Sequence, residues 1–298
     1  MKSKLRSLIM ILLAACMVFS GVQVARQVTA YHQAKASREA ALAAAQLVTP
    51  PVEDIPEVVV PMGSAPETNA DSGQRPRMED VIVKQPLEDD FASTEDAQAE
   101  ALLALDLEAL RQTNSDVLGW ITIPDTVISY PLMKAKDNQE YLYQTWDGKY
   151  SKFGSIFLEC RNSHDLSDFN TLIYGHNMLT DDMFGTLLEY ADQSHYESHP
   201  SVYVVTDSGV RRYDIFSAYE ANVVSDTYRL VFEDDARRQS ALELYTSSSV
   251  LDTGLTPEVT DSILTLSTCT GRGTANLRFV VQAVLAEEVR RGEKVKKQ

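Results

Sequence analysis

The chain has 298 residues, 44% of them hydrophobic, and a formal net charge of −16, so one or two domains are expected. The acidic balance argues against a nucleic-acid-binding protein, which needs clustered Lys and Arg, and against a basic patch that binds anionic lipid. Three cysteines, Cys16, Cys160 and Cys269, are too few and too unevenly spaced for a disulfide framework or a zinc site.

The first 94 residues predict an anchor and a tether rather than a folded domain. Residues 1–7 are basic and the run over 8–25 is apolar, so we expect a transmembrane anchor over 8–27 with a cytoplasmic N-terminus. A cleaved signal peptide, or a lipoprotein signal ending at Cys16 in "LAAC", are alternatives. Residues 28–94 begin alanine-rich and helical, then become acidic and proline-rich, which predicts a disordered tether.

Residues 95–290 predict a folded domain, followed by a basic tail over 291–298. An amphipathic helix should begin the domain, with Ser93 or Thr94 as its N-cap. Eight β-rich runs follow, separated by turn residues, which predicts a closed, mostly antiparallel barrel or a sandwich. These runs are "GWITI", "SYPLM", "GSIFLE", "NTLIYG", "SVYVVT", "RRYDIFSAYEA", "ILTLSTC" and "RFVVQAVLAEE". Two further helices are expected in connections, over about 181–191 and about 234–248.

The run "ILTLSTC" ends at a cysteine that suits nucleophilic chemistry. The strand period of two places Ser267 and Cys269 on one face. If this strand pairs with the next one as a hairpin, Arg278 lies beside Cys269. A guanidinium there favours the thiolate and can stabilise an oxyanion. Arg272, in the intervening glycine-rich turn, is a competing arginine.

A thiol nucleophile also needs a proton carrier, and His176 is the best candidate. It follows the apolar strand "TLIY" and Gly175, which is a rigid support for a functional side chain. Cys and His from separate parts of the chain are the pattern expected for thiol catalysis. His195 and His199 form an H-x3-H pair, but Pro200 ends any helix there, so we expect no metal site.

Each of these residues also has a non-catalytic interpretation. A lone cysteine on an apolar strand is usually a small buried hydrophobic residue. A lone histidine is usually structural, and Arg278 could cap a strand at the surface. The sequence alone also allows a Cys160–Cys269 disulfide.

The motifs together resemble the sortases, and class B sortases in particular. The resemblance rests on "TLSTC" followed by an arginine that opens the next strand, on "YGHNM", and on "DNQEYLYQTWDGKYSKFGSIFLECRN". It covers roughly residues 95–288, including the helix near 234–248. It implies an eight-stranded β-barrel and a membrane-anchored cysteine transpeptidase on the outside of a Gram-positive cell.

The resemblance also implies roles for individual residues. Cys269 would attack the carbonyl of a Thr in the C-terminal sorting signal of a secreted protein and form a thioacyl-enzyme. His176 would act as general acid or base, Arg278 would bind the oxyanion or the substrate, and Ser267 would contact the substrate. An amine of cell-wall peptide or a pilin lysine would then resolve the intermediate. No supporting role follows for Thr270, which stands where some relatives have an acidic residue.

Two other functions remain as alternatives on the sequence. A hydrolytic cysteine protease would use the same residues with water in place of the amine. A non-catalytic surface binding module would leave Cys269 inert. No nucleotide loop, metal cluster or haem motif is present in the sequence, so we expect no cofactor.

Overall fold

The computed structural model describes residues 2–46, 97–178, 180, 182–271 and 275–291, and it describes side chains from Cys16 onward. Several sequence predictions therefore lie outside the described residues. They are most of the tether over 28–94, the N-cap at Ser93 or Thr94, Arg272, and all but the first residue of the tail over 291–298.

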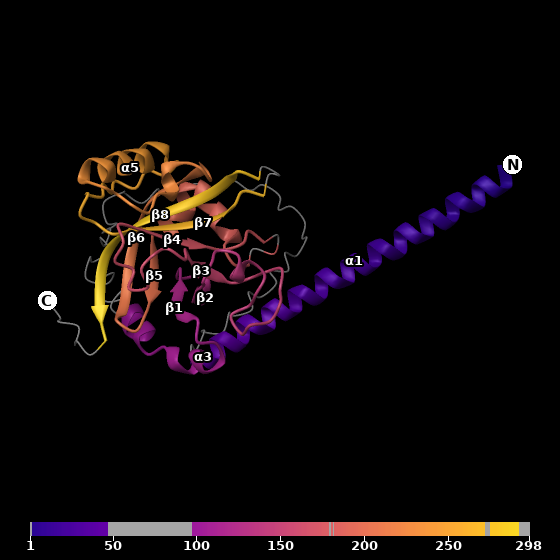
Figure 1. Ribbon diagram of the computed structural model, residues 1–298, viewed down its shortest axis with the longest axis horizontal. Coiled ribbons are helices and arrows are strands. Elements are labelled where there is room, and N and C mark those ends of the chain that lie inside the picture. Colours follow the sequence, from indigo (N-terminus) through magenta and orange to yellow (C-terminus); the bar gives the residue numbers. More distant parts are fainter. Residues whose placement is uncertain (1, 47–96, 179, 181, 272–274, 292–298) are drawn as a thin grey trace, which may run out of the picture.

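Eight strands among the described residues close into a barrel in the order β1-β2-β3-β4-β7-β8-β6-β5 (Figure 1). Each strand lies on one of the β-rich runs in the sequence. The bounds are β1 Val117–Thr122, β2 Ser129–Lys134, β3 Ile156–Leu158, β4 Asn170–Tyr174, β5 Ser201–Val205, β6 Gly209–Asn222, β7 Ile263–Cys269 and β8 Leu277–Arg290.

The barrel is mostly antiparallel, as the sequence predicted, but two of its eight neighbouring strand pairs are parallel. β2 pairs with β3 in parallel, and β4 pairs with β7 in parallel; the remaining neighbours are antiparallel. Parallel partners cannot be joined by a tight turn and need a long crossover. The connections over 135–155 and 175–262 supply these crossovers, and both border the candidate site described below.

The core fills the barrel interior and continues under the helices on its outside. Inside, aliphatic side chains such as Leu132, Ile173, Val204 and Leu266 are fully buried. Burial of such a side chain stabilises the fold by about 1.5–3 kcal/mol. A second cluster packs around Trp120, and a third lies between the barrel and the long helix of the β6–β7 connection.

The helices decorate the barrel, and their start points follow from capping residues. α5 (Asp235–Ser248) begins where the Asp234 carboxylate accepts from the Arg237 backbone N–H at 2.8 Å, as expected for the helix predicted near 234–248. The helix predicted after residue 93 is interrupted, because Asp106 caps a new helix there. The others are α1 Lys2–Ala44, α3 Leu107–Thr113, α4 Gln193–Ser198, and the 3-10 turns η1 Glu140–Leu142, η2 Gly185–Ala191 and η3 Asp226–Tyr228.

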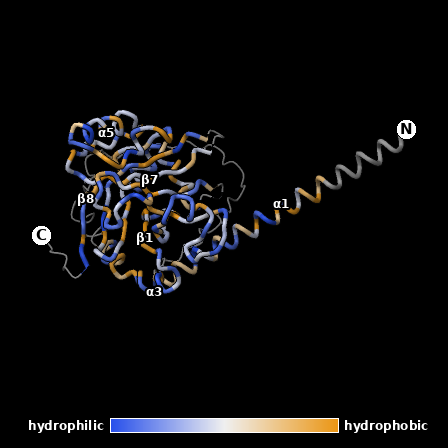
Figure 2. Tube along the Cα trace, in the orientation of Figure 1, coloured by the Kyte–Doolittle hydropathy of each residue, from blue (hydrophilic) through white to orange (hydrophobic). Residues whose placement is uncertain are grey.

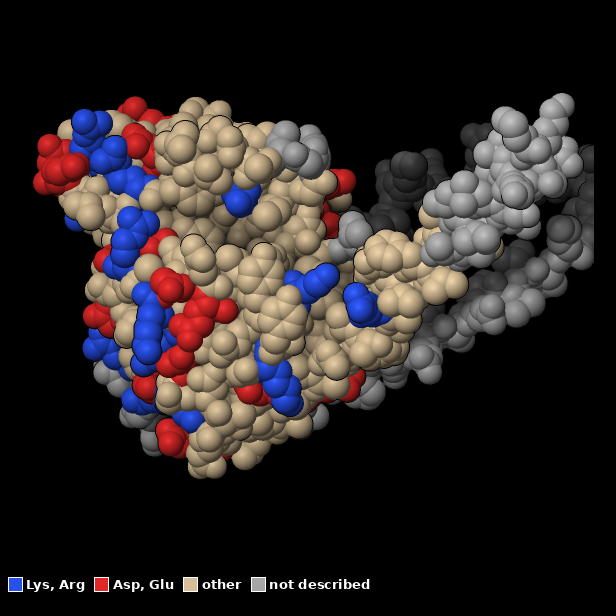
Figure 3. Space-filling model, turned by 45° about the vertical axis from the view of Figure 1, so that its right-hand side comes forward, with Lys and Arg blue, Asp and Glu red and all other residues tan. Residues whose placement is uncertain are grey.

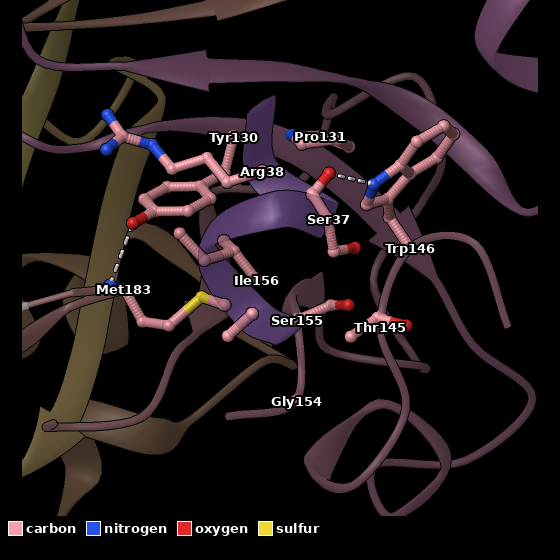
Figure 4. A pocket seen from close by; sticks show the side chains of 11 residues that line it. Ser37, Arg38, Tyr130, Pro131, Thr145, Trp146, Gly154, Ser155, Ile156 and Met183 are labelled. Atoms are coloured by element: carbon pink, nitrogen blue, oxygen red, sulfur yellow. Dashed lines mark hydrogen bonds between the residues drawn. The ribbon is translucent and has the colours of Figure 1, made fainter. Parts of the chain in front are cut away.

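The C-terminal half of α1 docks on the barrel, while its N-terminal half projects away from it (Figure 1). The Trp146 indole donates to the Ser37 carbonyl at 2.8 Å. Arg38 donates to the Val127 carbonyl at 2.8 Å and stacks over Tyr130 at 5.0 Å from the ring centroid. Figure 4 shows these side chains around a small pocket between α1 and the barrel.

The prediction of a transmembrane anchor over 8–27 is wrong for the part of the chain that the structure describes. No helix within it is both long enough and apolar enough to cross a bilayer. The described side chains of α1 include Arg26, Lys35 and Arg38, and Figure 2 shows hydrophilic and hydrophobic residues alternating along the coloured part of this helix. The last turns of α1, which follow the predicted anchor in the chain, pack on the barrel.

Charges of both signs are intermixed on the surface around the barrel. Figure 3 shows Lys and Arg alternating with Asp and Glu in a band along one side, while uncharged residues cover most of the face that is turned forward. The interspersed pattern differs from the strongly acidic segment over 51–100, where thirteen Asp or Glu stand against three Lys or Arg.

Candidate active site

The parallel pairing of β4 with β7 brings His176 and Cys269 to the same rim of the barrel. Tyr174 is the register partner of Ser267. His176 follows Tyr174 by two residues, and Cys269 follows Ser267 by two residues. Because parallel strands end at the same edge, the two side chains leave the sheet at corresponding positions. Both line one pocket.

Cys269 and Arg278 are direct partners across the β7–β8 hairpin, as the sequence predicted. Residues directly opposite each other in an antiparallel pair lie on the same face of the sheet. The guanidinium Nη1 of Arg278 donates to the carbonyls of Ala275 and Leu277, each at 3.0 Å. These bonds hold the side chain at the mouth of the turn. The Cys269 thiol is free and exposed.

The pocket at this rim, which we call the rim pocket, gathers residues from six separate segments of the chain. It is lined among others by Cys269, His176, Arg278, Ser267, Tyr228 and Tyr174. The sequence therefore named four of these six, and all four lie together. Such a concave site with several convergent polar groups is typical of a substrate-binding site.

A backbone carbonyl fixes the orientation of the His176 ring. Nε2 lies 2.7 Å from the carbonyl oxygen of Leu142. A carbonyl can only accept, so Nε2 carries a proton and donates it. In the neutral ring Nδ1 is then the basic nitrogen, which is the one able to take up a proton.

The loop that carries His176 is tied to the cysteine strand and to the core. The Asn177 side-chain amide donates to the Cys269 carbonyl at 2.8 Å. The Phe184 backbone N–H donates to the His176 carbonyl at 3.0 Å. Gly175 is required here, since a Cβ at this position would lie 2.7 Å from the buried Phe184 ring. The loop therefore holds His176 in place from both sides.

Ser267 occupies the predicted face but does not point a free hydroxyl at the pocket. It is buried, and its hydroxyl bonds the Tyr228 hydroxyl at 2.9 Å. Burial raises the pKa of Tyr228, although the Ser267 bond and the nearby Arg278 charge act in the opposite direction. Tyr228 thus stays protonated. Tyr228 lies in the connection between β6 and β7, and no pattern in the sequence singled it out.

A buried carboxylate, that of Glu159, lies in the wall of the rim pocket. Glu159 is 1% exposed and accepts from Asn138 at 2.6 Å, Tyr174 at 3.0 Å and the Arg161 guanidinium at 2.8 Å. Burial alone would raise the pKa of Glu159, but these hydrogen bonds outweigh it and lower the pKa. The sequence analysis missed this network, because its members come from two connections and one strand.

None of the other described cysteine and histidine side chains lines the rim pocket. Cys160 is a free thiol, so the alternative disulfide with Cys269 does not form. Burial and the neighbouring Glu159 carboxylate raise the pKa of Cys160, which keeps it a thiol. The rings of His195 and His199 have centroids 4.4 Å apart and are tilted by 35°. No group of three potential metal ligands occurs among the described side chains.

Comparison with known proteins identifies the family. Residues 121–286 match the Sortase domain model. The chain is 34% identical over 162 residues to sortase B of Staphylococcus aureus, which covers 54% of this chain and 66% of that protein. It is also 34% identical over 183 residues to sortase B of Listeria monocytogenes, which covers 60% of this chain and 74% of that protein. It is also similar to a Staphylococcus aureus sortase B–substrate complex, with 29% identity and a TM-score of 0.58 over 66% of this chain and 91% of that chain. The chain therefore belongs to the sortase family, as a cysteine transpeptidase of class B.

Proposed function

We propose that this sortase cleaves a C-terminal sorting signal after Thr and joins the protein to an amine of cell-wall peptide or to a pilin lysine. The observation that carries the proposal is the convergence of Cys269, His176 and Arg278 on the rim pocket. The substrates are secreted proteins, so the catalytic domain works outside the cell.

Cys269 is the nucleophile in this scheme. Its sulfur attacks the Thr carbonyl, the peptide C–N bond breaks, and the thioacyl bond forms. His176 gives the proton to the leaving amine from Nδ1 when protonated there, and it takes a proton from the incoming amine in the second half-reaction. The Leu142 carbonyl keeps the ring in the orientation that both transfers require.

Arg278 stabilises the negative charge that develops on the carbonyl oxygen during attack. Its bonds to the turn carbonyls use Nη1, so among the described contacts Nη2 and Nε are left for a substrate. A preorganised donor at such a position typically contributes about 10²–10³ in rate. Ser267 acts on the substrate through Tyr228, whose hydroxyl it holds.

Mass spectrometry of the protein with sorting-signal peptides and an excess of amine tests the proposal. The peptides should cover the NPxTx, LPxTx and PPxTx types. We expect a thioacyl adduct on Cys269 and a product cut after Thr and joined to the amine; Cys269→Ala should give neither. Cleavage that is resolved by water alone, at any amine concentration, would point to a protease. An unlabelled Cys269 that also resists a thiol-reactive probe would point to a binding module.

A further inference from the structure

Two tyrosines next to the catalytic rim are exposed to an unusual degree. Tyr143 is 53% exposed and Tyr150 is 74% exposed, although large aromatic side chains usually lie mostly buried. Their rings are nearly parallel, at an angle of 17° with centroids 6.4 Å apart. We call these two rings the tyrosine pair. Exposed aromatic rings that lie together are typical of ligand contacts.

The backbone beneath the tyrosine pair is held in one conformation. The Ser151 N–H donates to the Tyr143 carbonyl at 2.9 Å, and the Thr145 N–H donates to the Lys149 carbonyl at 2.8 Å. Gln144 and Tyr150 form an antiparallel bridge. The rings therefore project from a hairpin whose backbone is already ordered, which lowers the entropic cost of binding a ligand.

Tyr143 of the tyrosine pair lies next to His176 without lining the rim pocket. The Tyr143 and His176 ring centroids lie 6.3 Å apart. The residue before Tyr143 is Leu142, whose carbonyl accepts from His176 and which itself lines the rim pocket. Tyr143 does not line that pocket. A ligand on the tyrosine pair and a peptide in the rim pocket would therefore approach His176 from two different directions.

We propose that the tyrosine pair binds the ammonium group of the acceptor and guides it to the thioacyl bond on Cys269. The face of a tyrosine ring attracts a cation through its quadrupole. His176, beside the pair, is the group that takes the proton of the incoming amine. This inference rests on the proposed function, because an acceptor exists only if an amine resolves the intermediate.

The second half-reaction balances with this placement. The ammonium loses one proton before attack, and the resulting amine forms the C–N bond as the C–S bond breaks. A second proton leaves nitrogen as the tetrahedral intermediate collapses. One of the two protons restores the Cys269 thiol, and the other reaches solvent through His176. Tyr143 and Tyr150 take no part in bond making and are positioning residues.

The test separates the two half-reactions in the full chain. The thioacyl-enzyme is formed first with a sorting-signal peptide, and its decay is followed against the concentration of triglycine or Nα-acetyl-lysine amide. For Tyr143→Ala, we expect the half-saturating amine concentration to rise about two- to five-fold, the magnitude of an exposed cation–π contact. Acylation should stay within about two-fold of the wild type, and a larger fraction of the intermediate should be lost to water.

Two matched substitutions identify the aromatic face as the cause. Tyr143→Phe keeps the ring and should behave like the wild type, whereas Tyr143→Leu keeps the bulk without the ring and should behave like Tyr143→Ala. An unchanged amine dependence in Tyr143→Ala, or an equal loss in Tyr143→Phe, would overturn the inference. A slower acylation of the same size would assign Tyr143 to the peptide site instead.

A binding measurement keeps the inference testable if no thioacyl-enzyme forms in the wild type. That outcome would count against the proposed function. The Tyr143 ring signals in NMR spectra of the Cys269→Ala variant should shift on addition of triglycine and not on addition of N-acetyl-triglycine, which has no amine. Identical responses to both peptides, or none to either, would refute ammonium binding by the tyrosine pair.

Discussion

Replacement of Glu159 by Gln should destabilise the protein strongly, because it puts an amide where several donors converge on one buried carboxylate. The substitution keeps the volume of the side chain. Asn138 and Tyr174 both donate to Oε2, and Arg161 donates to Oε1. In the Gln variant, the NH₂ group must replace one of these two oxygens, and it then faces donors that have lost their acceptor. The Arg161 side chain is mostly exposed and can turn to water. Asn138 and Tyr174 cannot do so without leaving the wall of the rim pocket.

The expected cost follows from these contacts. A buried donor left without a partner costs about 1–3 kcal/mol, and a hydrogen bond to a charged group is worth about 1 kcal/mol more than one to a neutral group. Glu159→Gln should therefore lower the free energy of unfolding by about 2–4 kcal/mol. For a domain of this size, that corresponds to a fall in Tm of about 4–16 °C.

The pH dependence identifies the carboxylate as the source. The pKa of Glu159 is lowered in the folded protein. The ionised carboxylate therefore contributes fully to the free energy of unfolding at pH values above the ordinary carboxyl range, and this contribution disappears as pH falls through the pKa in the folded protein. Urea unfolding at pH 7 and at about pH 3 should show a gap between wild type and Glu159→Gln that closes at low pH. Asp207→Asn, which breaks an exposed pair with Arg111, is the control and should cost less than about 1 kcal/mol. A Glu159→Gln protein as stable as this control, or a gap that does not change with pH, would refute the reasoning.

Three further substitutions test how the site is held. Gly175→Ala places a Cβ 2.7 Å from the Phe184 ring, so calorimetry should show a free energy of unfolding lower by about 1–3 kcal/mol. The acylation rate should fall by more than the loss of folded protein explains. An unchanged acylation rate in the folded fraction would contradict this. Asn177→Ala removes the 2.8 Å hydrogen bond to the Cys269 carbonyl, and the thioacyl burst should slow about two- to twelve-fold, with Asn177→Asp equally slow because a carboxylate cannot donate. Trp146→Phe removes the hydrogen bond to α1, so amide hydrogen exchange should accelerate in the last turns of α1 while the barrel strands exchange as before; equal exchange in α1 would show that the indole N–H does not hold the helix.

The strands and the Cys269–Arg278 pair could be predicted because their signals are local. Each strand coincides with a β-rich run between turn residues, and the period of two together with a short turn places Arg278 opposite Cys269. The helix at Asp235–Ser248 also carries its own capping signal in Asp234. These features depend on residues that are neighbours in the sequence.

The rest depends on pairings between distant segments, which a single sequence does not encode in any visible pattern. The parallel pairing of β4 with β7 is one case, and the contacts of Tyr228 with Ser267 and of Asn177 with Cys269 are others. The segment over 181–191 was predicted as a helix, but it is a 3-10 turn from Gly185 preceded by Met183 with φ of 57°. Positive φ at a non-glycine residue is set by tertiary contacts rather than by local preference.

The distance along the chain between β4 and β7 also determines when in folding the protein becomes reactive. Tyr174 and Ser267 pair in the sheet although they are 93 positions apart (267 minus 174). Contacts of such sequence separation form late, since a long loop must close before they can stabilise anything. Before β4 and β7 pair, Cys269 therefore has no imidazole beside it, although the local β7–β8 hairpin already places Arg278 opposite it. The Cys269–His176 pair therefore forms together with the substrate groove. A folding intermediate of this protein should not cleave other proteins.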